Sequence, residues 1–195
     1  MSEKLIKAID EVKHLPEIKL GSIVDRIGDE ALLIISLISI IPFMQPIPIP
    51  GLSTLLGLVV LLQGLGMIFL GKPLLTKRLK NLKLTHEKIN MIHRAAVRFD
   101  KFTSKISAFK HPIINSRGVH IVCGFTITLS AAYLSLPLPI PFSNFIPALC
   151  IFFICAGLLE CDLVLVIFGH FIAATTVWMA GLSFHLIVEK FQLWF

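Results

Sequence analysis

The chain has 195 residues, of which 55% are hydrophobic and 15% are charged, and its mean hydropathy is +0.85. A soluble domain of this size would lack the polar side chains needed to cover its surface, so the composition excludes an ordinary water-soluble enzyme and predicts one compact membrane domain, 1–195. The formal net charge of +6 comes from the middle of the chain, where residues 72–117 hold twelve Lys and Arg against two acids.

Residues 1–30 are expected to form an amphipathic segment at the membrane surface. Apolar side chains recur at helical spacing before Pro16, and residues 20–28 favour a second short helical turn. Both charge signs are present, which argues against a cleavable secretory signal. Asp25 and Arg26 lie just before the first apolar run. They are either a solvated helix start, with acids near its positive end, or polar groups at the mouth of a cavity.

The uncharged stretch 31–71 is broken by prolines at alternate positions. A proline lacks the amide donor of a helix and crowds the preceding turn, so the chain must run extended between two helical legs. The first leg has about 15 residues and would cover ~22 Å of the ~30 Å hydrocarbon core. The hairpin therefore either spans the membrane with little tilt or is re-entrant. The residues singled out at the break are Pro48, Pro50, Gly51 and Ser53.

The second leg of this hairpin carries glycines at a spacing of seven residues, Gly57, Gly64 and Gly71. They form a narrow face of bare backbone, which predicts close association with another helix, in the same chain or in a second copy. Gln63 is the strongly polar residue of this leg. An amide in hydrocarbon needs a partner, so Gln63 is either an interhelical hydrogen-bonding group or a substrate contact.

A basic amphipathic segment, 72–117, separates the two apolar halves. Thr85 is placed to cap a helix whose apolar stripe runs to Phe109, with Lys and Arg on the other faces. The positive-inside rule puts this segment in the cytoplasm and, after an even number of crossings, the amino terminus as well. We expect the helix to lie among anionic lipid headgroups or on the cytoplasmic face of the bundle. Nucleic acid is not expected as a partner, because the segment does not present a basic surface with stacking aromatics.

Residues 118–162 repeat the pattern of 31–71. An offset of 91 residues, from Pro46 to Pro137, places the three prolines of the first break on those of the second, which predicts a duplicated hairpin. Proline-interrupted segments at matching places in two halves point to a binding site between the repeats. The second repeat contributes two acids that either terminate the span or form a functional pair. Its candidate residues are Pro139, Asn144, Pro147, Glu160 and Asp162.

Residues 163–195 are predicted to form the last transmembrane helix, with an aromatic tail on the far side. His170 lies inside this span. A membrane-embedded His is a functional candidate, although a single neutral imidazole commonly bonds to a neighbouring helix. The expected fold class is therefore all-α: a polytopic membrane protein with two proline-broken hairpins, a fifth transmembrane helix and amphipathic cytoplasmic helices.

The sequence carries no catalytic signature. We find no nucleophile with a matching base and no phosphate-binding loop. The four cysteines fall within or at the edge of apolar segments, and their spacing matches neither a zinc site nor a redox pair. The sequence therefore predicts a protein that is not an enzyme and that has no metal and no cofactor.

Several short motifs follow one another along residues 19–180. They are Gly21 to Gly28 with Asp25 and Arg26, Ile49 to Ser53, Gly71 to Pro73, Leu136 to Pro139, Asn144 to Ala148, and Gly157 to Asp162. In combination they resemble the ExoD family of bacterial membrane proteins. The resemblance implies an inner-membrane protein linked to making or exporting exopolysaccharide. The family brings no established reaction, so no catalytic residue is carried over.

Two functions are compatible with this pattern. The first is a non-enzymatic, transporter-like module with a polar cavity between the two hairpin repeats. The alternative is an assembly or regulatory membrane partner of polysaccharide synthases, with the basic amphipathic helix as its docking face.

Overall fold

The computed structural model describes residues 7, 10, 11, 18–44, 52–71, 81, 83–106, 109–136 and 143–192. The proline breaks predicted at Pro48, Pro50, Gly51 and Pro139 lie outside the described residues, as does most of the predicted helix before Pro16.

The described chain is helical apart from one pair of two-residue strands, which confirms the all-α fold class. Strand β1 (Ile18–Lys19) pairs antiparallel with β2 (Lys83–Leu84) and so ties the amino-terminal segment to the start of the basic segment. The helices are α2 (Leu20–Ile27), η1 (Gly28–Glu30), α3 (Ala31–Ile40), η2 (Ile41–Met44), α4 (Leu52–Phe69), α6 (His86–Ile106), η3 (Pro112–Asn115), α7 (Arg117–Leu134), α8 (Phe145–Glu160) and α9 (Leu163–Gln192).

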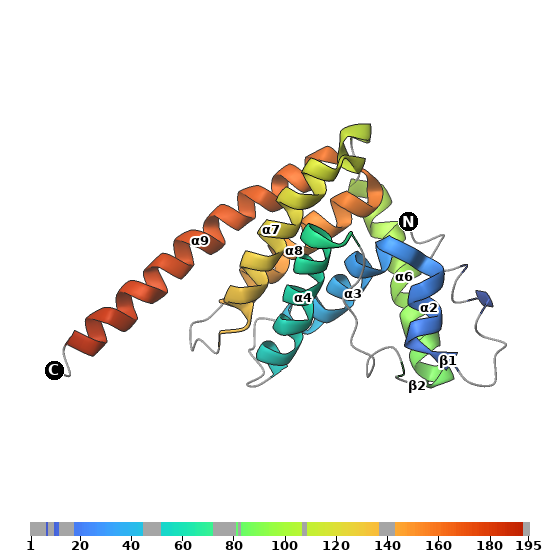
Figure 1. Ribbon diagram of the computed structural model, residues 1–195, viewed down its shortest axis with the longest axis horizontal. Helices are drawn as coiled ribbons and strands as arrows, with labels where there is room; N and C mark the ends of the chain where they lie inside the picture. The colour runs from blue at the N-terminus through green and yellow to red at the C-terminus, as the bar shows by residue number, and fades with distance from the viewer. Residues whose placement is uncertain are drawn as a thin grey trace.

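The helices α3, α4, α7 and α8 pack in a ring. Helix α3 contacts α4, α4 contacts α7, α7 contacts α8, and α8 returns to α3. Helix α9 lies outside this ring against α8 and α7, and its carboxyl-terminal half projects beyond the other helices (Figure 1). Helices α2 and α6 stand on the opposite side of the molecule (Figure 1). Helices α2 and α9 therefore occupy different sides of one central bundle.

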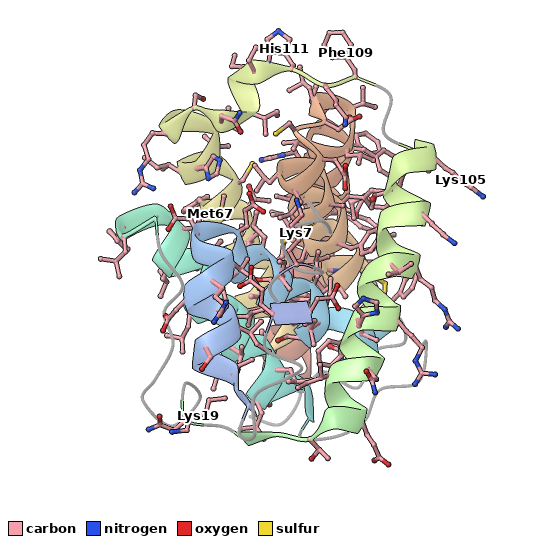
Figure 2. All side chains as sticks on the ribbon, turned by 90° about the vertical axis from the view of Figure 1, so that its right-hand side faces the viewer. Lys7, Lys19, Met67, Lys105, Phe109 and His111 are labelled. Carbon is pink, nitrogen blue, oxygen red and sulfur yellow. The ribbon has the colours of Figure 1, made fainter. Side chains whose placement is uncertain are left out.

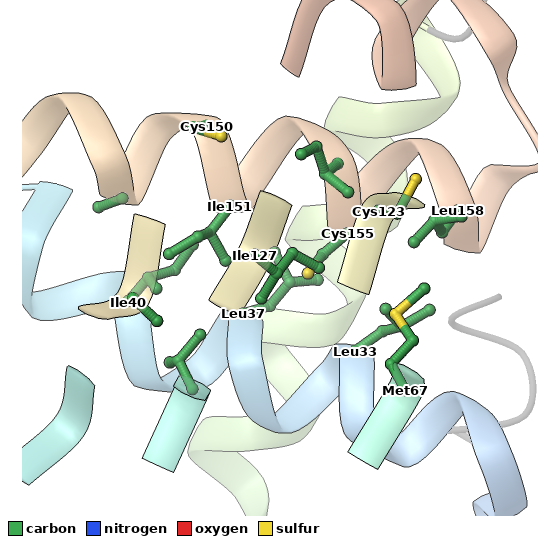
Figure 3. Packing of buried hydrophobic residues seen from close by; sticks show 14 of the residues in the cluster. Leu33, Leu37, Ile40, Met67, Cys123, Ile127, Cys150, Ile151, Cys155 and Leu158 are labelled. Carbon is green, nitrogen blue, oxygen red and sulfur yellow. The ribbon is translucent and has the colours of Figure 1, made fainter. Parts of the chain in front are cut away.

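An apolar cluster fills the space inside the ring. Leu37 and Ile40 of α3 face Ile127 of α7 and Ile151 and Cys155 of α8 (Figure 3). Lipid tails are as apolar as these side chains, so in a membrane the cluster is stabilised by close van der Waals packing rather than by removal from water. The shape of the contact surfaces therefore decides how these helices associate.

The predicted glycine groove of α4 is occupied by α7. A Cβ atom on Gly57 would lie 3.1 Å from Ser135 Cα, and one on Gly64 would lie 3.0 Å from Thr128 N and 3.1 Å from Gly124 O. These contacts run in opposite directions along the two helices, so α4 and α7 are antiparallel. We call this contact surface, Gly57 and Gly64 with Gly124, Thr128 and Ser135, the α4–α7 seam. The association predicted for the groove is formed within the chain.

The pair α8 and α9 makes a second close crossing. A Cβ atom on Gly157 would lie 2.7 Å from Val166 N, and one on Gly169 would lie 2.9 Å from Ile154 N. Gly169 is therefore part of a close helix contact, whereas no described atom lies within 4 Å of a Cβ atom on Gly181.

The outside of the bundle is rich in exposed apolar side chains. Examples on different helices are Leu55, Phe125 and Phe171. Three described stretches are long and apolar enough to cross a membrane, Leu20–Met44, Arg117–Leu134 and Leu163–Gly181, and Thr54–Phe69 and Phe145–Glu160 are shorter apolar helices. An apolar belt around a packed bundle is what a lipid-facing surface requires.

The structure changes the expectation for the start of the first hairpin. The predicted first span began at residue 31, whereas α2, η1, α3 and η2 follow one another without a gap from Leu20 to Met44. Gly28, the first residue of η1, has a positive φ of 73°, a conformation that glycine adopts without a steric penalty. The helical path therefore turns at Gly28 instead of starting afresh after a loop.

Two further expectations concern the ends of helices. Helix α6 begins at His86, directly after Thr85, as predicted. It ends at Ile106, so the apolar stripe that was expected to run to Phe109 stops earlier, and Phe109 is 51% exposed. Gly71 does not extend the α4–α7 seam. It lies beyond α4 with a positive φ of 65° and donates its N–H to Gly66 O at 2.8 Å, which ends the helix.

The α4–α7 seam predicts a large penalty for one added methyl group. In Gly64→Ala the new Cβ would meet the backbone of Thr128 and Gly124. Overpacking of this kind costs about 1–3 kcal/mol, more than the ~0.5–1 kcal/mol that alanine gains over glycine in a helix. Thermal unfolding in detergent should show a lower midpoint for Gly64→Ala. Gly181→Ala, in open space, is the control and should leave the midpoint unchanged or raise it. Equal midpoints for both variants would contradict the seam.

Candidate functional site

The helix ends on either side of the two proline segments meet directly. Thr54 Oγ1, in the first turn of α4, donates a hydrogen bond to Ser135 O, just after α7, at 3.2 Å. Helix η2 also contacts α8, which begins after the second proline segment. The residues that flank both breaks therefore share one end of the bundle, which we call the proline end.

The candidate residues at the proline end are placed differently from one another. Asn144 directly precedes α8 and is half-buried, and Pro147 is buried in the first turn of that helix. Ser53 belongs to α4, but its side chain lies outside the description. Ser143 is buried, and its hydroxyl has no hydrogen-bond partner among the residues that the structure describes. The predicted polar character of this end is therefore carried in the structure by Thr54, Ser143 and Asn144.

Gln63 is buried inside the bundle and is 1% exposed. Small polar side chains are also buried on the neighbouring helices, Ser36 on α3 and Ser130 on α7. Ser36 donates to Leu32 O at 2.9 Å, and Ser130 donates to Cys150 Sγ at 3.4 Å. The same helices also contribute side chains to the apolar cluster. Of these buried polar residues, Gln63 is the one that the sequence singled out.

Asp162 holds together the turn between α8 and α9. Its Oδ1 accepts a hydrogen bond from Leu165 N at 3.1 Å and so caps the start of α9. Its Oδ2 accepts from Phe109 N at 2.9 Å. Leu163 N in turn donates to Phe109 O at 3.0 Å. The carboxylate thus joins the α8–α9 turn to the segment that follows α6, and it is 0% exposed.

Glu160 links the same turn to α6 itself. Its Oε1 accepts a hydrogen bond from Thr103 Oγ1 at 3.1 Å, and Thr103 is fully buried. Cys161, between the two acids, takes a left-handed conformation with φ 54° and accepts a bond from His111 N at 3.0 Å. The sequence left two roles open for these acids, ending the span or forming a functional pair. In the structure each acid makes a structural contact, Glu160 with α6 and Asp162 with the segment after α6.

Asp25 and Arg26 lie on α2, and both are exposed. Arg26 forms an ion pair with Glu11 of the amino-terminal segment. An exposed pair of this kind contributes little to stability because water and salt screen it. The pair therefore shows that Glu11 lies beside α2.

His170 is half-buried in α9. Its Nδ1 lies 2.8 Å from Val166 O, one helical turn earlier, so Nδ1 carries the proton. Its Nε2 is buried and has no hydrogen-bond partner in the described part of the chain. The imidazole bonds to its own helix, whereas the sequence considered a bond to a neighbouring helix.

Arg117 is a residue that the sequence reasoning missed. It opens α7, and its guanidinium donates to Met67 O at 2.9 Å and to Ile68 O at 2.6 Å. A cation at the carboxyl end of a helix satisfies its last carbonyls and opposes the negative end of the helix dipole. The signal available in the sequence was an Arg at the exact border between a basic segment and an apolar run.

The candidate residues thus form two separate groups and several isolated positions. One group lies at the proline end, and the other lies at the α8–α9 turn. Within the described ranges, no group of three or more His, Cys, Asp or Glu side chains is placed to hold a metal ion. The two groups of candidate residues form hydrogen bonds and cap the ends of helices.

Loss of the Asp162 carboxylate should loosen the turn between α8 and α9. In Asp162→Ala the N–H groups of Phe109 and Leu165 lose their acceptor, at ~1–3 kcal/mol for each buried group left unpaired. Asp162→Asn keeps one acceptor oxygen, so its stability should lie between that of the unaltered chain and that of Asp162→Ala. We expect faster amide hydrogen exchange at Phe109 and a lower unfolding midpoint in detergent.

Glu160→Gln is the matched control, because the amide oxygen can still accept from Thr103. It should leave both measurements close to those of the unaltered chain. If Asp162→Ala behaved like Glu160→Gln, the role of Asp162 in the turn would be wrong.

Comparison with known proteins agrees with the resemblance seen in the motifs. The family profile described as "Exopolysaccharide synthesis, ExoD" matches residues 2–182. A curated relative, Protein ExoD of Rhizobium meliloti (strain 1021), is 29% identical over 173 residues, which cover 86% of this chain and 71% of the relative. No solved structure matches the chain. The chain therefore belongs to the ExoD family, whose name refers to exopolysaccharide synthesis.

Proposed function

We propose that the chain is a non-enzymatic membrane module of transporter type that serves exopolysaccharide synthesis or export. The observation that supports this most strongly is the way the helices before and after the two proline segments meet. Helices α3 and α4 flank the first segment and α7 and α8 flank the second, and Thr54 and Ser135 are hydrogen-bonded between them. On this proposal the two parts are repeats of one hairpin, and substrate passes between them.

The ring of helices supports the repeat. If α3 is equivalent to α7 and α4 to α8, each contact in the ring has a counterpart. The contact of α3 with α4 corresponds to that of α7 with α8, and the contact of α4 with α7 corresponds to that of α8 with α3. The apolar cluster closes the ring, so passage requires the hairpins to separate along a contact. The α4–α7 seam is a suitable place, since small residues meet along much of it, and Ile68 and Met67 are the larger side chains that lie against Gly124 there.

The same proposal gives the chain an orientation. The basic segment and the amino terminus lie in the cytoplasm of a bacterium, in its inner membrane, because Lys and Arg are retained on that side. Helices α3, α4, α7, α8 and α9 then cross or enter the membrane in turn. The α8–α9 turn and the segment after α6 lie at the cytoplasmic surface, and the proline end lies at the opposite surface.

Transport is tested by flux in liposomes. We expect the purified chain to carry an ion, a sugar or a lipid-linked sugar across vesicles that are otherwise tight. In a cysteine-free background, Thr54→Cys with Ser135→Cys should allow oxidation to close the proline end. Flux should fall at least about tenfold on oxidation, as a locked element cannot change state, and should return on reduction.

The single variants Thr54→Cys and Ser135→Cys are the controls, and oxidation should leave their flux unchanged. If none of the three substrate classes moves through the unlocked chain, transport is excluded as the function.

A second candidate is an assembly partner of polysaccharide synthases. The docking face predicted from the sequence was the basic amphipathic helix, but a different feature of the structure favours assembly. Helix α9 projects beyond the bundle, and Phe171 and Trp178 on it are exposed (Figure 1). A projecting apolar helix offers a second membrane protein a surface to pack against.

The assembly role is tested by co-purification with a synthase from the same membrane. Phe171→Ala with Trp178→Ala should reduce the recovered synthase at least about fivefold, because large aromatic side chains dominate most interfaces. Phe125→Ala with Leu129→Ala removes exposed apolar side chains from α7 instead and should have no effect. Equal recovery with both double variants would argue against docking through α9.

A further inference from the structure

Helix α6 has one side turned toward the protein. Ile89 is 1% exposed and Thr103 is fully buried, and Thr103 donates its hydrogen bond to Glu160 of α8. His93 is half-buried, and its Nε2 lies 3.9 Å from Oδ1 of Asp10 in the amino-terminal segment. The buried side of this amphipathic helix is therefore covered by the rest of the chain, which leaves the opposite side for something else.

The other side of α6 is exposed and mostly basic. The described side chains that follow one another there at spacings of three and four are all exposed, and they are Glu87, Asn90, Arg94, Arg98, Lys101 and Lys105. Residues at this spacing share one helix face. We call them the basic face. Lys105 extends outward from the end of α6 in Figure 2.

The chain just after α6 presents apolar side chains beside further positive charge. Phe109 and Ile113 are 51% and 49% exposed, and Lys110 between them is also exposed. Phe109 stacks on His111, with ring centroids 5.7 Å apart, at the end of the molecule toward which α6 runs (Figure 2). The backbone here is held by Asp162 and by Cys161 O. The exposed side chains are thus carried on a fixed segment.

We propose that the basic face and the segment 109–113 together dock on the anionic surface of the lipid bilayer. A bilayer surface accepts both features at once, since phosphate groups attract Lys and Arg while Phe and Ile enter the boundary below them. A soluble anion would bind the charges but would leave Phe109 and Ile113 in water. Charge and exposed apolar area therefore favour lipid over a dissolved ligand.

The position in the fold supports the same partner. The segment 109–113 is fastened to the first residues of α9, where the exposed Val164 and Ile167 begin the apolar belt of a membrane-spanning stretch. The docking surface would therefore meet the bilayer where α9 enters it. This inference rests on the membrane location and cytoplasmic orientation within the proposed function, and it is independent of transport.

Depth-dependent fluorescence quenching tests the proposal on the full chain. Phe109→Trp is introduced together with Trp178→Phe and Trp194→Phe, which removes both native tryptophans. The protein is placed in nanodiscs whose lipids carry bromine on the acyl chains, with or without phosphatidylglycerol. We expect stronger quenching with phosphatidylglycerol, and a loss of roughly half or more of that increase in 1 M salt, since screening then extends over only ~3 Å.

Charge reversal identifies the surface responsible. Lys101→Glu with Lys105→Glu should abolish the increase caused by phosphatidylglycerol. Lys7→Glu with Lys19→Glu makes the same change in net charge at exposed positions outside the basic face and should preserve it. Size-exclusion chromatography confirms that every variant is folded.

Three results would overturn the proposal. Quenching that is the same with both lipids and both charge variants would show that the basic face does not bind anionic lipid. Absence of quenching in every disc would place the segment 109–113 in water. Unchanged quenching with loss of synthase co-purification in Lys101→Glu with Lys105→Glu would assign the basic face to a protein partner. Each result is separate from the flux experiment, so failure here and failure of transport are distinguishable.

Discussion

The fold depends on how closely helical backbones approach one another without side chains between them. In lipid, an apolar side chain gains little by leaving its surroundings, so helices associate where their surfaces fit and where backbones come near. Gly57 and Gly64 provide such a surface for α7, and Gly157 and Gly169 provide one at the crossing of α8 and α9. Larger residues at these positions would move the helices apart, and the cluster inside the ring would lose its packing contacts.

Polar groups are used at the ends of the helices, where a membrane protein most needs them. Backbone N–H and C=O groups that lack a partner are costly near hydrocarbon, and each helix leaves several of them at its ends. Asp162 accepts from one such N–H group, that of Leu165, and from the N–H of Phe109 in the segment after α6, and Arg117 donates to two such carbonyls. The charged residues nearest the bundle thus fasten neighbouring elements to one another. An acid or a base beside a span is therefore weak support for catalysis in this chain.

The structure divides the molecule into an apolar layer and a charged layer. The ring of helices presents an apolar belt, whereas the amino-terminal segment and α6 place most of the charge to one side. Contacts through Glu160 and Asp162 connect these layers, so a change in the position of α6 would also displace the start of α9. The membership in the ExoD family gives this architecture a biological setting in exopolysaccharide synthesis.

The sequence by itself determined the class of fold, the helix order and the family. Hydrophobic periodicity, hydropathy and helix-breaking residues are local properties of a sequence, so the predicted apolar spans lie close to α4, α7, α8 and α9. The motifs from Gly21 to Asp162 identified the family. Only the tertiary structure decided which helix occupies the glycine groove, that Asp162 accepts a hydrogen bond from Phe109 N, and that Arg117 closes the end of α4. Those outcomes depend on contacts between residues far apart in sequence, and a single sequence carries no record of such pairings.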